Sequence, residues 1–231
     1  MSGFSLGTRH VRVCVLGTLF FLILASRPVF TEGITLNAEF WVDIEGLPAN
    51  DSKESTQRYS PPQALLDEAS WVFSGIIDGF EFEWTPLDLT RKIEERFSLV
   101  PAGKIQRGDP RLKPGTLRQE TGRLFAWIEC RPGIAGSAMI ESRGREPWLS
   151  AGARGSAPLG SGLDGRRAAC EDAIREAIRA LLRSQEPNKP RLVRGRLAFV
   201  SPPLAAIHGG RWIATVKLRV AVGELLKYGV Y

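Results

Sequence analysis

Residues 34–44 decide the fold class and read Ile34-Thr35-Leu36-Asn37-Ala38-Glu39-Phe40-Trp41-Val42-Asp43-Ile44. Every second side chain in this stretch is apolar, and the residues between them are polar apart from Trp41. A period of two residues is typical of a β-strand with one buried face. We therefore predict a strand over 34–44 that buries Ile34, Leu36, Ala38, Phe40, Val42 and Ile44.

A helix is predicted to follow this strand after a polar segment at 46–59. Its start carries three signals, with Ser60 as the N-cap, Pro61 at the first helical position and Gln63 at the third position to close a capping box. Apolar residues at spacings of three and four form its buried stripe, and Gly79 is expected to end it. The stripe comprises Leu65, Leu66, Ala69, Val72, Phe73, Ile76 and Ile77.

Further elements are predicted from the same patterns along the rest of the chain. Alternation indicates a strand over 80–84, and Thr85-Pro86 is expected to begin a short helix that buries Leu89, Ile93 and Phe97. The remaining predictions are a loop over 101–115, one long strand over 117–131 covered on both faces, a strand over 148–156, a helix over 166–184 behind Asp164, and an antiparallel pair of strands over 192–200 and 211–222.

These elements predict an α+β fold, in which about three helices pack on a mainly antiparallel sheet. The expected organisation has four parts: a signal peptide at 1–33, an acidic β-α-β-α subdomain at 34–100, a linker at 101–115, and a basic subdomain at 116–231 that ends in a β-hairpin.

The N-terminal segment has the features of a secretion signal. A basic head at 9–12 precedes an apolar run at 13–25, which as a helix would reach only about 20 Å against a hydrocarbon core of about 30 Å. Small residues favour cleavage after Gly33, with cuts near Ala25 or Ser26 as alternatives. We expect export to a bacterial periplasm or cell envelope, with no transmembrane span in the mature chain; an uncleaved N-terminal anchor is the alternative.

Charge is distributed unevenly along the chain. Residues 34–100 carry 13 acidic and 5 basic side chains, whereas residues 101–231 carry 11 acidic and 23 basic ones. Because export makes nucleic acid an unsuitable partner, the basic half is expected to bind an acidic envelope component or protein. The alternative is that the two halves dock on each other within one fold.

The candidate binding residues are basic side chains on the outer side of the third helix and of the last strand. No catalytic residue, metal site or cofactor is assigned, because the chain contains no nucleophile elbow, zinc-binding helix or phosphate loop. The binding set comprises Arg175, Arg179, Arg183, Arg211, Lys217 and Arg219.

Two cysteines, Cys130 and Cys170, fall on faces predicted to be buried. In an oxidising compartment they are candidates for a disulfide. Two separately buried thiols are the alternative, since free cysteine is common in protein cores.

Catalytic groups are sparse after the expected signal. Glu81 and Glu83 share one side of a strand, as paired carboxylates do in glycosidases, and His208 is the one histidine left. We therefore interpret the chain as a non-enzymatic binding or assembly protein. An envelope hydrolase acting on peptidoglycan and a structural homo-oligomer, in which the acidic half of one copy docks on the basic half of the next, are the alternatives.

Residues 150–222 resemble a small secreted module found in the twenty-kilodalton surface lipoprotein family and in the flagellar H- and T-ring assembly protein. The resemblance implies a helix packed on a small antiparallel sheet and a non-enzymatic role in the envelope, and it transfers no functional residues. It is carried by Ala151-Gly152-Ala153-Arg154-Gly155, by the alanine-spaced helix from Arg166 through Ala173 and Ala177 to Leu181-Leu182, by Val193-Arg194-Gly195, and by Gly209-Gly210-Arg211-Trp212-Ile213-Ala214-Thr215-Val216.

Overall fold

The computed structural model of the protein describes residues 33–44, 60–106, 108–145, 147–159, 162–186 and 188–229. Contacts divide the chain into two units, Met1–Thr31 and Glu32–Tyr231. The expected signal segment, except for Gly33, and the polar segment 46–59 lie outside the described residues.

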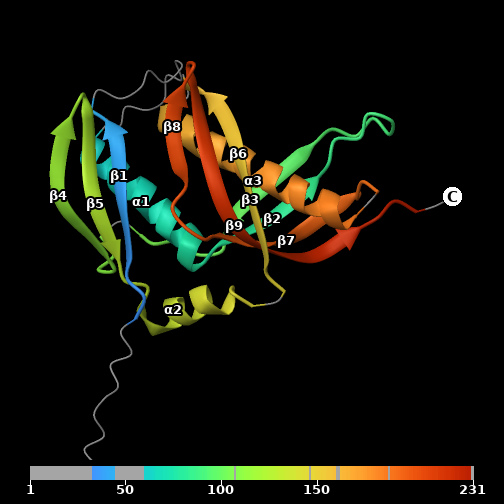
Figure 1. Cartoon of the computed structure of the whole chain (residues 1–231), viewed down its shortest axis with the longest axis horizontal. Coiled ribbons are helices and arrows are strands. Elements are labelled where there is room, and N and C mark those ends of the chain that lie inside the picture. The colour runs from blue at the N-terminus through green and yellow to red at the C-terminus, as the bar shows by residue number, and fades with distance from the viewer. Residues whose placement is uncertain are drawn as a thin grey trace, which may run out of the picture. The chain divides into compact units, whose positions relative to one another are not determined.

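The unit Glu32–Tyr231 has an α+β fold, as predicted, with antiparallel sheets and helices packed on them (Figure 1). Its elements in chain order are β1 (Leu36–Asp43), α1 (Pro61–Ile77), β2 (Phe80–Thr85), β3 (Arg96–Pro101), β4 (Leu112–Glu120), β5 (Arg123–Cys130), α2 (Gly133–Ser142), β6 (Leu149–Pro158), α3 (Gly162–Gln185), β7 (Leu192–Phe199), β8 (Leu204–His208) and β9 (Arg211–Leu226).

The strands form two sheets. One has three strands in the order β1-β5-β4, and the other has six, in the order β3-β2-β7-β9-β6 with β8 beside β9. The 16-residue strand β9 pairs with β6 along one edge and with both β8 and β7 along the other. β9 therefore pairs with three of the other five strands of the larger sheet.

Two helices cover the inner faces of the sheets. α1 contacts β1 and β5 of the smaller sheet and β7 of the larger one, and α3 lies across β6 and β9. Phe40 of β1 meets Phe73 of α1 edge to face, with 5.4 Å between ring centroids. The predicted alternation of the first strand is confirmed, because Ala38, Phe40 and Val42 are buried.

A buried cation connects β1 to the N-terminal turns of α3. The guanidinium of Arg166 lies over the ring of Trp41 at 4.2 Å and over the ring of Trp212 at 4.8 Å. Its Nη1 donates a hydrogen bond to the carbonyl oxygen of Trp41 and lies 3.8 Å from the Glu68 carboxylate. Burial lowers the pKa of Arg166, with the Glu68 charge acting in the opposite direction. This residue therefore joins the two sheets through a desolvated charge whose aromatic contacts stabilise it.

Helix α1 begins and ends where the sequence predicts, although its capping box does not form. Pro61 is its first residue, but the Ser60 side chain makes no capping hydrogen bond. Gly79 adopts a φ of +81° and donates its N–H to the Ser74 carbonyl oxygen, which closes the last turn as a C-terminal glycine does.

Three predictions about the connections were wrong. Residues 86–95 form no helix: Leu89 is 80% exposed, and the connection closes through a bridge between Asp88 and Ile93 before β3 begins. The single strand predicted over 117–131 is a hairpin of β4 and β5 that turns at Thr121-Gly122, where both φ angles are positive. Its outer face is open, because Trp127 is 60% exposed. The sequence also missed α2 and β8, both short elements.

The acidic and basic halves of the chain do not form separate subdomains. β1 from the acidic half pairs with β5 from the basic half, and acidic β2 pairs with basic β7. On the β2–β7 pair, Glu83 lies directly opposite Arg194, and their side chains form an ion pair at 2.7 Å. Acidic side chains of the first half therefore pair with basic side chains of the second half within one fold. This agrees with the alternative that the two halves dock on each other.

The structure contains the second of the two alternatives for the cysteines, two separate thiols, and not the candidate disulfide. Cys130 on β5 and Cys170 on α3 are both free and buried, and they belong to different hydrophobic clusters. Burial raises the pKa of Cys130 to about 11 and that of Cys170 to about 12. Both thiols are therefore inert core residues in the folded protein.

Gly155 sets how closely β6 approaches α3, which yields a stability prediction. A Cβ at this position would lie 2.1 Å from the Ala173 nitrogen and 2.6 Å from the Ala169 carbonyl oxygen. We expect Gly155→Ala to lower the free energy of unfolding by about 2 kcal/mol or more, because backbone must move to admit the methyl group. Gly223→Ala is the matched control, since its Cβ would meet nothing closer than 3.7 Å. The measurement is urea unfolding, and an equal decrease in the free energy of unfolding in both variants would contradict this packing.

The cysteines give a second prediction, made on the Cys14→Ser chain so that only Cys130 and Cys170 contribute. Thiol titration of the unreduced protein should count two thiols after denaturation and almost none in the native state, because both groups are desolvated. Fewer than two thiols in the denatured, unreduced protein would show a disulfide instead.

Candidate functional site

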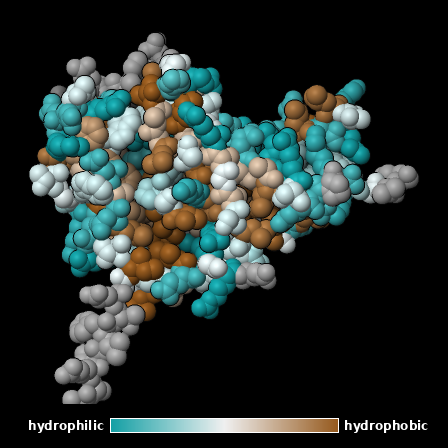
Figure 2. All heavy atoms as spheres, viewed as in Figure 1, coloured by the Kyte–Doolittle hydropathy of each residue, from teal (hydrophilic) through white to brown (hydrophobic). Residues whose placement is uncertain are grey.

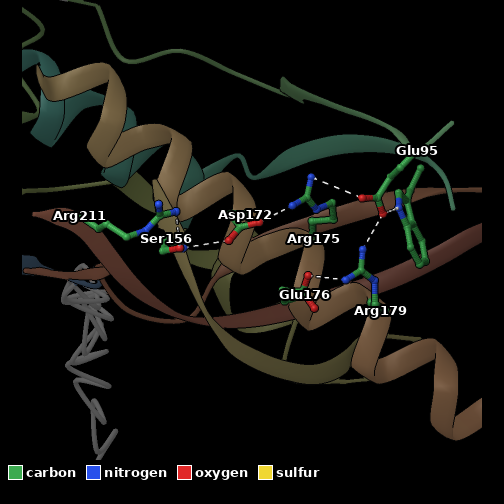
Figure 3. Close-up of polar contacts among 8 residues, drawn as sticks. Glu95, Ser156, Asp172, Arg175, Glu176, Arg179 and Arg211 are labelled. Atoms are coloured by element: carbon green, nitrogen blue, oxygen red, sulfur yellow. Dashed lines mark hydrogen bonds and ion pairs between the residues drawn. The ribbon is translucent and has the colours of Figure 1, made fainter. Parts of the chain in front are cut away.

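The arginines predicted on the outer side of the third helix are held by acidic neighbours. Arg179 donates from Nη2 to Glu95 Oε1 at 2.7 Å, and Arg175 Nη1 lies 3.6 Å from Glu95 Oε2. Arg175 also bonds Asp172, and Arg179 bonds Glu176, each one turn earlier on α3. Figure 3 shows both guanidinium groups turned toward Glu95.

Glu95 is the common acceptor of this cluster, and it comes from the connection between β2 and β3. The indole Nε1 of Trp84 donates to Glu95 Oε1 at 2.9 Å. Burial alone would raise the pKa of Glu95, but the hydrogen bonds from Trp84 and Arg179 and the nearby arginine charges outweigh it, so the pKa is lowered. Glu95 therefore stays ionised, and its ion pairs connect the segment between β2 and β3 to α3.

A polar network continues from this cluster to the last strand (Figure 3). Asp172 Oδ2 accepts a hydrogen bond from the Ser156 N–H at 2.9 Å, and the Ser156 hydroxyl accepts one from Arg211 Nη2 at 3.0 Å. The network therefore brings Arg175, Arg179 and Arg211 together, with the first two neutralised by carboxylates.

Arg183 differs from the other two helix arginines. It is exposed, and no ion pair or hydrogen bond engages its side chain within the described part of the chain. Together with Trp84 and Leu182 it lines a cavity of about 420 Å³ between the C-terminal part of α3 and the start of the β2–β3 connection.

The remaining predicted residues lie on the outer face of the six-stranded sheet. The register of β6 and β9 sets Ser150 opposite Arg219, Gly152 opposite Lys217 and Arg154 opposite Thr215. We call the surface formed by Arg154, Arg211, Lys217 and Arg219 the basic sheet face. It is open because α3 covers the other side of these strands, where Val216 and Leu218 are buried.

Cations on the basic sheet face lack acidic partners among the described residues. Arg211 and Arg219 donate only to the hydroxyls of Ser156 and Ser150, while Arg154 and Lys217 make no side-chain hydrogen bond or ion pair. The sequences of β6 and β8, and residues 211–223 of β9, contain no Asp or Glu. The positive charge of this face is therefore available to an outside ligand.

A shallow hollow of about 300 Å³ lies on the basic sheet face. Lys217 and Arg219 border it, with Ser150, Ala151, Gly152, Val200 and Leu218 completing its lining. Gly152 has no side chain to fill the space beside Lys217, so two cations and a hydroxyl surround the same depression. This arrangement suits a carboxylate or another small anionic group.

The sequence analysis missed Arg154, although the alternation of 148–156 had placed a strand there. Its outward position on β6 was recognisable from Ala151, Ala153 and Ala157 on the opposite face. The hollow beside Gly152 had no sequence signal, because it depends on the register between β6 and β9.

The candidates for hydrolysis are exposed: Glu81 and Glu83 lie on β2, and His208 lies on β8. Glu83 is engaged by Arg194, which also bonds Glu224 at 3.0 Å, and these hydrogen bonds raise the pKa of Arg194. Glu81 lies opposite Arg196 on β7. His208 ends β8 at the turn Gly209-Gly210, where both φ angles are positive. The two carboxylates thus take part in an ionic surface, and His208 does not join them.

The described residues contain no metal cluster and no membrane-spanning helix. No group of three or more His, Cys, Asp or Glu side chains there is arranged to hold a metal ion. None of the described helices has the length and apolar character needed to cross a membrane. A cavity of about 640 Å³ is lined by Trp71 and Phe80, with Ser70, Lys104 and Arg167 among its polar groups.

Removing the Glu95 charge tests the cluster on α3. We expect Glu95→Gln to lower the free energy of unfolding by about 1 to 2 kcal/mol at pH 7, because two guanidinium groups and an indole N–H lose a charged acceptor. The neighbouring exposed Glu94→Gln is the control and should stay within about 0.5 kcal/mol.

The same variant gives a pH dependence. Because the folded-state pKa of Glu95 lies below its ordinary value of 4.5, its contribution is complete above that value and is lost as the pH falls below it. The difference in unfolding midpoint between the native chain and Glu95→Gln should therefore shrink toward pH 3. A difference independent of pH would show that the charge of Glu95 is not what stabilises the fold.

A protein of known sequence is similar to this chain over most of its length. The chain is 26% identical over 211 residues to an uncharacterized protein of Treponema pallidum (strain Nichols), covering 89% of this chain and 87% of the relative. No solved structure matches it. Residues 27–228 match the model of an uncharacterized protein family, and the chain belongs to that family.

Proposed function

We propose that the protein is exported to the bacterial envelope and acts there by binding or assembly without catalysis, with the basic sheet face holding an acidic partner. The observation that carries this proposal is the hollow beside Gly152, where Lys217 and Arg219 meet without an acidic partner among the described residues. Unpaired cations on an open surface raise the rate at which an acidic partner associates and penalise basic ones.

The contrast with α3 supports this choice of surface. Arg175 and Arg179 form ion pairs with Glu95, so a partner would have to displace this internal carboxylate in order to bind them. Lys217 and Arg154 form no ion pair in the described structure, so a partner could bind them without displacing a carboxylate. The sheet face is therefore favoured over the helix face among the residues predicted from the sequence.

Export is supported by the basic head and the thirteen-residue apolar run at 13–25. The resemblance of residues 150–222 to the small secreted module of envelope proteins points to the same class of role. In the fold, that segment contributes β6, α3, β7, β8 and most of β9, and it carries the whole basic sheet face.

Charge reversal on the basic sheet face tests the proposal. The probe is an immobilised acidic polymer, poly-L-glutamate, and the measurement is the retained fraction across a salt gradient, followed by co-fractionation with the native envelope. We expect the double variant Lys217→Glu/Arg219→Glu to bind at least about tenfold more weakly, because two attractions become repulsions.

The control carries the same change in net charge at other exposed sites. Arg183→Glu/Arg191→Glu reverses two cations outside the basic sheet face, neither of which forms an ion pair in the described structure. Equal loss of retention in both double variants would mean that net charge alone determines binding, and the basic sheet face would then have no special role.

A further inference from the structure

The cavity of about 640 Å³ is lined by residues of α1, of the segment that follows β3, and of the start of α3. Its volume lies in the range of sites that hold small molecules. Trp71 and Phe80 give it aromatic walls, with 5.7 Å between their ring centroids, and Pro101 and Ile105 add apolar surface. Figure 2 shows hydrophobic residues reaching the surface near the C-terminal part of α1, whose place Figure 1 gives. The apolar part of the cavity therefore suits a planar ring.

The segment after β3 is fixed against the C-terminal part of α1. The Ile105 N–H donates a hydrogen bond to Ser74 Oγ at 2.8 Å, and the Ile105 side chain is fully buried. A Cβ on Gly103 would lie 2.5 Å from Asp78 Oδ2, so the absence of a side chain allows this close approach. The fold therefore holds the backbone of Lys104, which lies between these two residues, in a defined place beside the cavity.

Two polar groups of the cavity have no partner within the described part of the chain. The exposed Lys104 makes no hydrogen bond or ion pair there, and neither does the hydroxyl of the buried Ser70. A polar group inside a protein is stabilised only when water or a ligand supplies the missing hydrogen bond. An ammonium and a hydroxyl thus remain available to a molecule that enters the cavity.

Arg167 of α3 adds a second cation to the lining. Its Nε lies 3.5 Å from Glu68 Oε2, and its Nη2 donates to the carbonyl oxygen of Asp67 at 3.4 Å. Glu68 also lies 3.8 Å from Arg166, so two guanidinium groups share this one carboxylate. Asp67 is the single acidic residue among the described residues that line the cavity. Two cations against one carboxylate favour an anionic ligand over a cationic one.

We propose that this cavity binds a small aromatic carboxylic acid. The ring packs against Trp71 and Phe80, and the carboxylate accepts hydrogen bonds from Lys104 and Ser70. Hydrogen bonds between charged groups are stronger than those between neutral ones, so the carboxylate sets the preference and the ring adds apolar contact. The proposal rests neither on export nor on the basic sheet face.

Two probes that differ in one functional group test the site in the full chain. 2-Naphthoate has a planar ring with a carboxylate, and 2-naphthamide has the same ring with a neutral amide. Isothermal titration calorimetry at neutral pH measures the Kd of each. Lys104→Gln removes the unpaired charge, and Ser70→Leu places a larger apolar side chain in the cavity. Lys113→Gln is the matched control, because Lys113 is also exposed, forms no ion pair in the described structure and lies on β4.

We expect the native chain to bind 2-naphthoate with a Kd of about 1 mM or lower, and at least about tenfold more tightly than 2-naphthamide. Lys104→Gln should weaken 2-naphthoate at least about fivefold and change 2-naphthamide by less than about twofold, because only the acid uses the charge. Ser70→Leu should weaken both probes, and Lys113→Gln should weaken neither.

Three results would overturn the proposal: no binding of 2-naphthoate to the native chain, equal affinity for the two probes, or equal losses in Lys104→Gln and Lys113→Gln. Lys104 is exposed, so its replacement leaves the fold intact and decides the outcome whether or not Ser70→Leu folds.

The test is separable from that of the basic sheet face. Lys217→Glu/Arg219→Glu should leave the Kd for 2-naphthoate unchanged, and Lys104→Gln should leave retention on poly-L-glutamate within about twofold of the native chain. Loss of 2-naphthoate binding in the sheet variant would place the probe on the basic sheet face and overturn the assignment to the cavity.

Discussion

The structure depends on a single strand that must satisfy two environments at once. β9 pairs with β6, β7 and β8, and its even-numbered residues from Trp212 to Val220 are buried. Its odd-numbered residues include Arg211, Lys217 and Arg219, which face outward. Because the side-chain period of a strand is two, a slip of one residue would move cations into the core and apolar groups into water. The register of β9 therefore determines both the inner packing and the outer charge.

Charge neutralisation inside the fold is the second constraint. The acidic half supplies Glu83 and Glu95, and the basic half supplies Arg194, Arg175 and Arg179. These pairs connect segments about 80 to 110 residues apart in sequence. The net charge of each half thus overstates what reaches the surface. Four of the cations that have no carboxylate partner in the described structure, Arg154, Arg211, Lys217 and Arg219, lie on the outer side of β6 and β9.

The position of the proposed contact surface follows from what lies behind it. The basic sheet face is open because α3 uses the other side of the same strands for the core.

The sequence by itself determined the elements whose period is long and regular. β1, α1, β2, α3, β7 and β9 were predicted because burial of one face imposes a period of 2 or 3.6 residues. The α+β class followed from them. Short elements such as α2 and β8 were not predicted, and the β4–β5 hairpin was predicted as one strand.

Only the tertiary structure decided which arginines are free. Arg175 and Arg183 look alike in the sequence of α3, but Glu95 reaches one and not the other. Likewise, Cys130 and Cys170 both carried the pattern of buried residues, yet they lie in different clusters. Periodicity reports whether a side chain faces inward or outward, whereas its partner depends on contacts between distant segments. Those contacts arise from strand order and register, which no local pattern encodes.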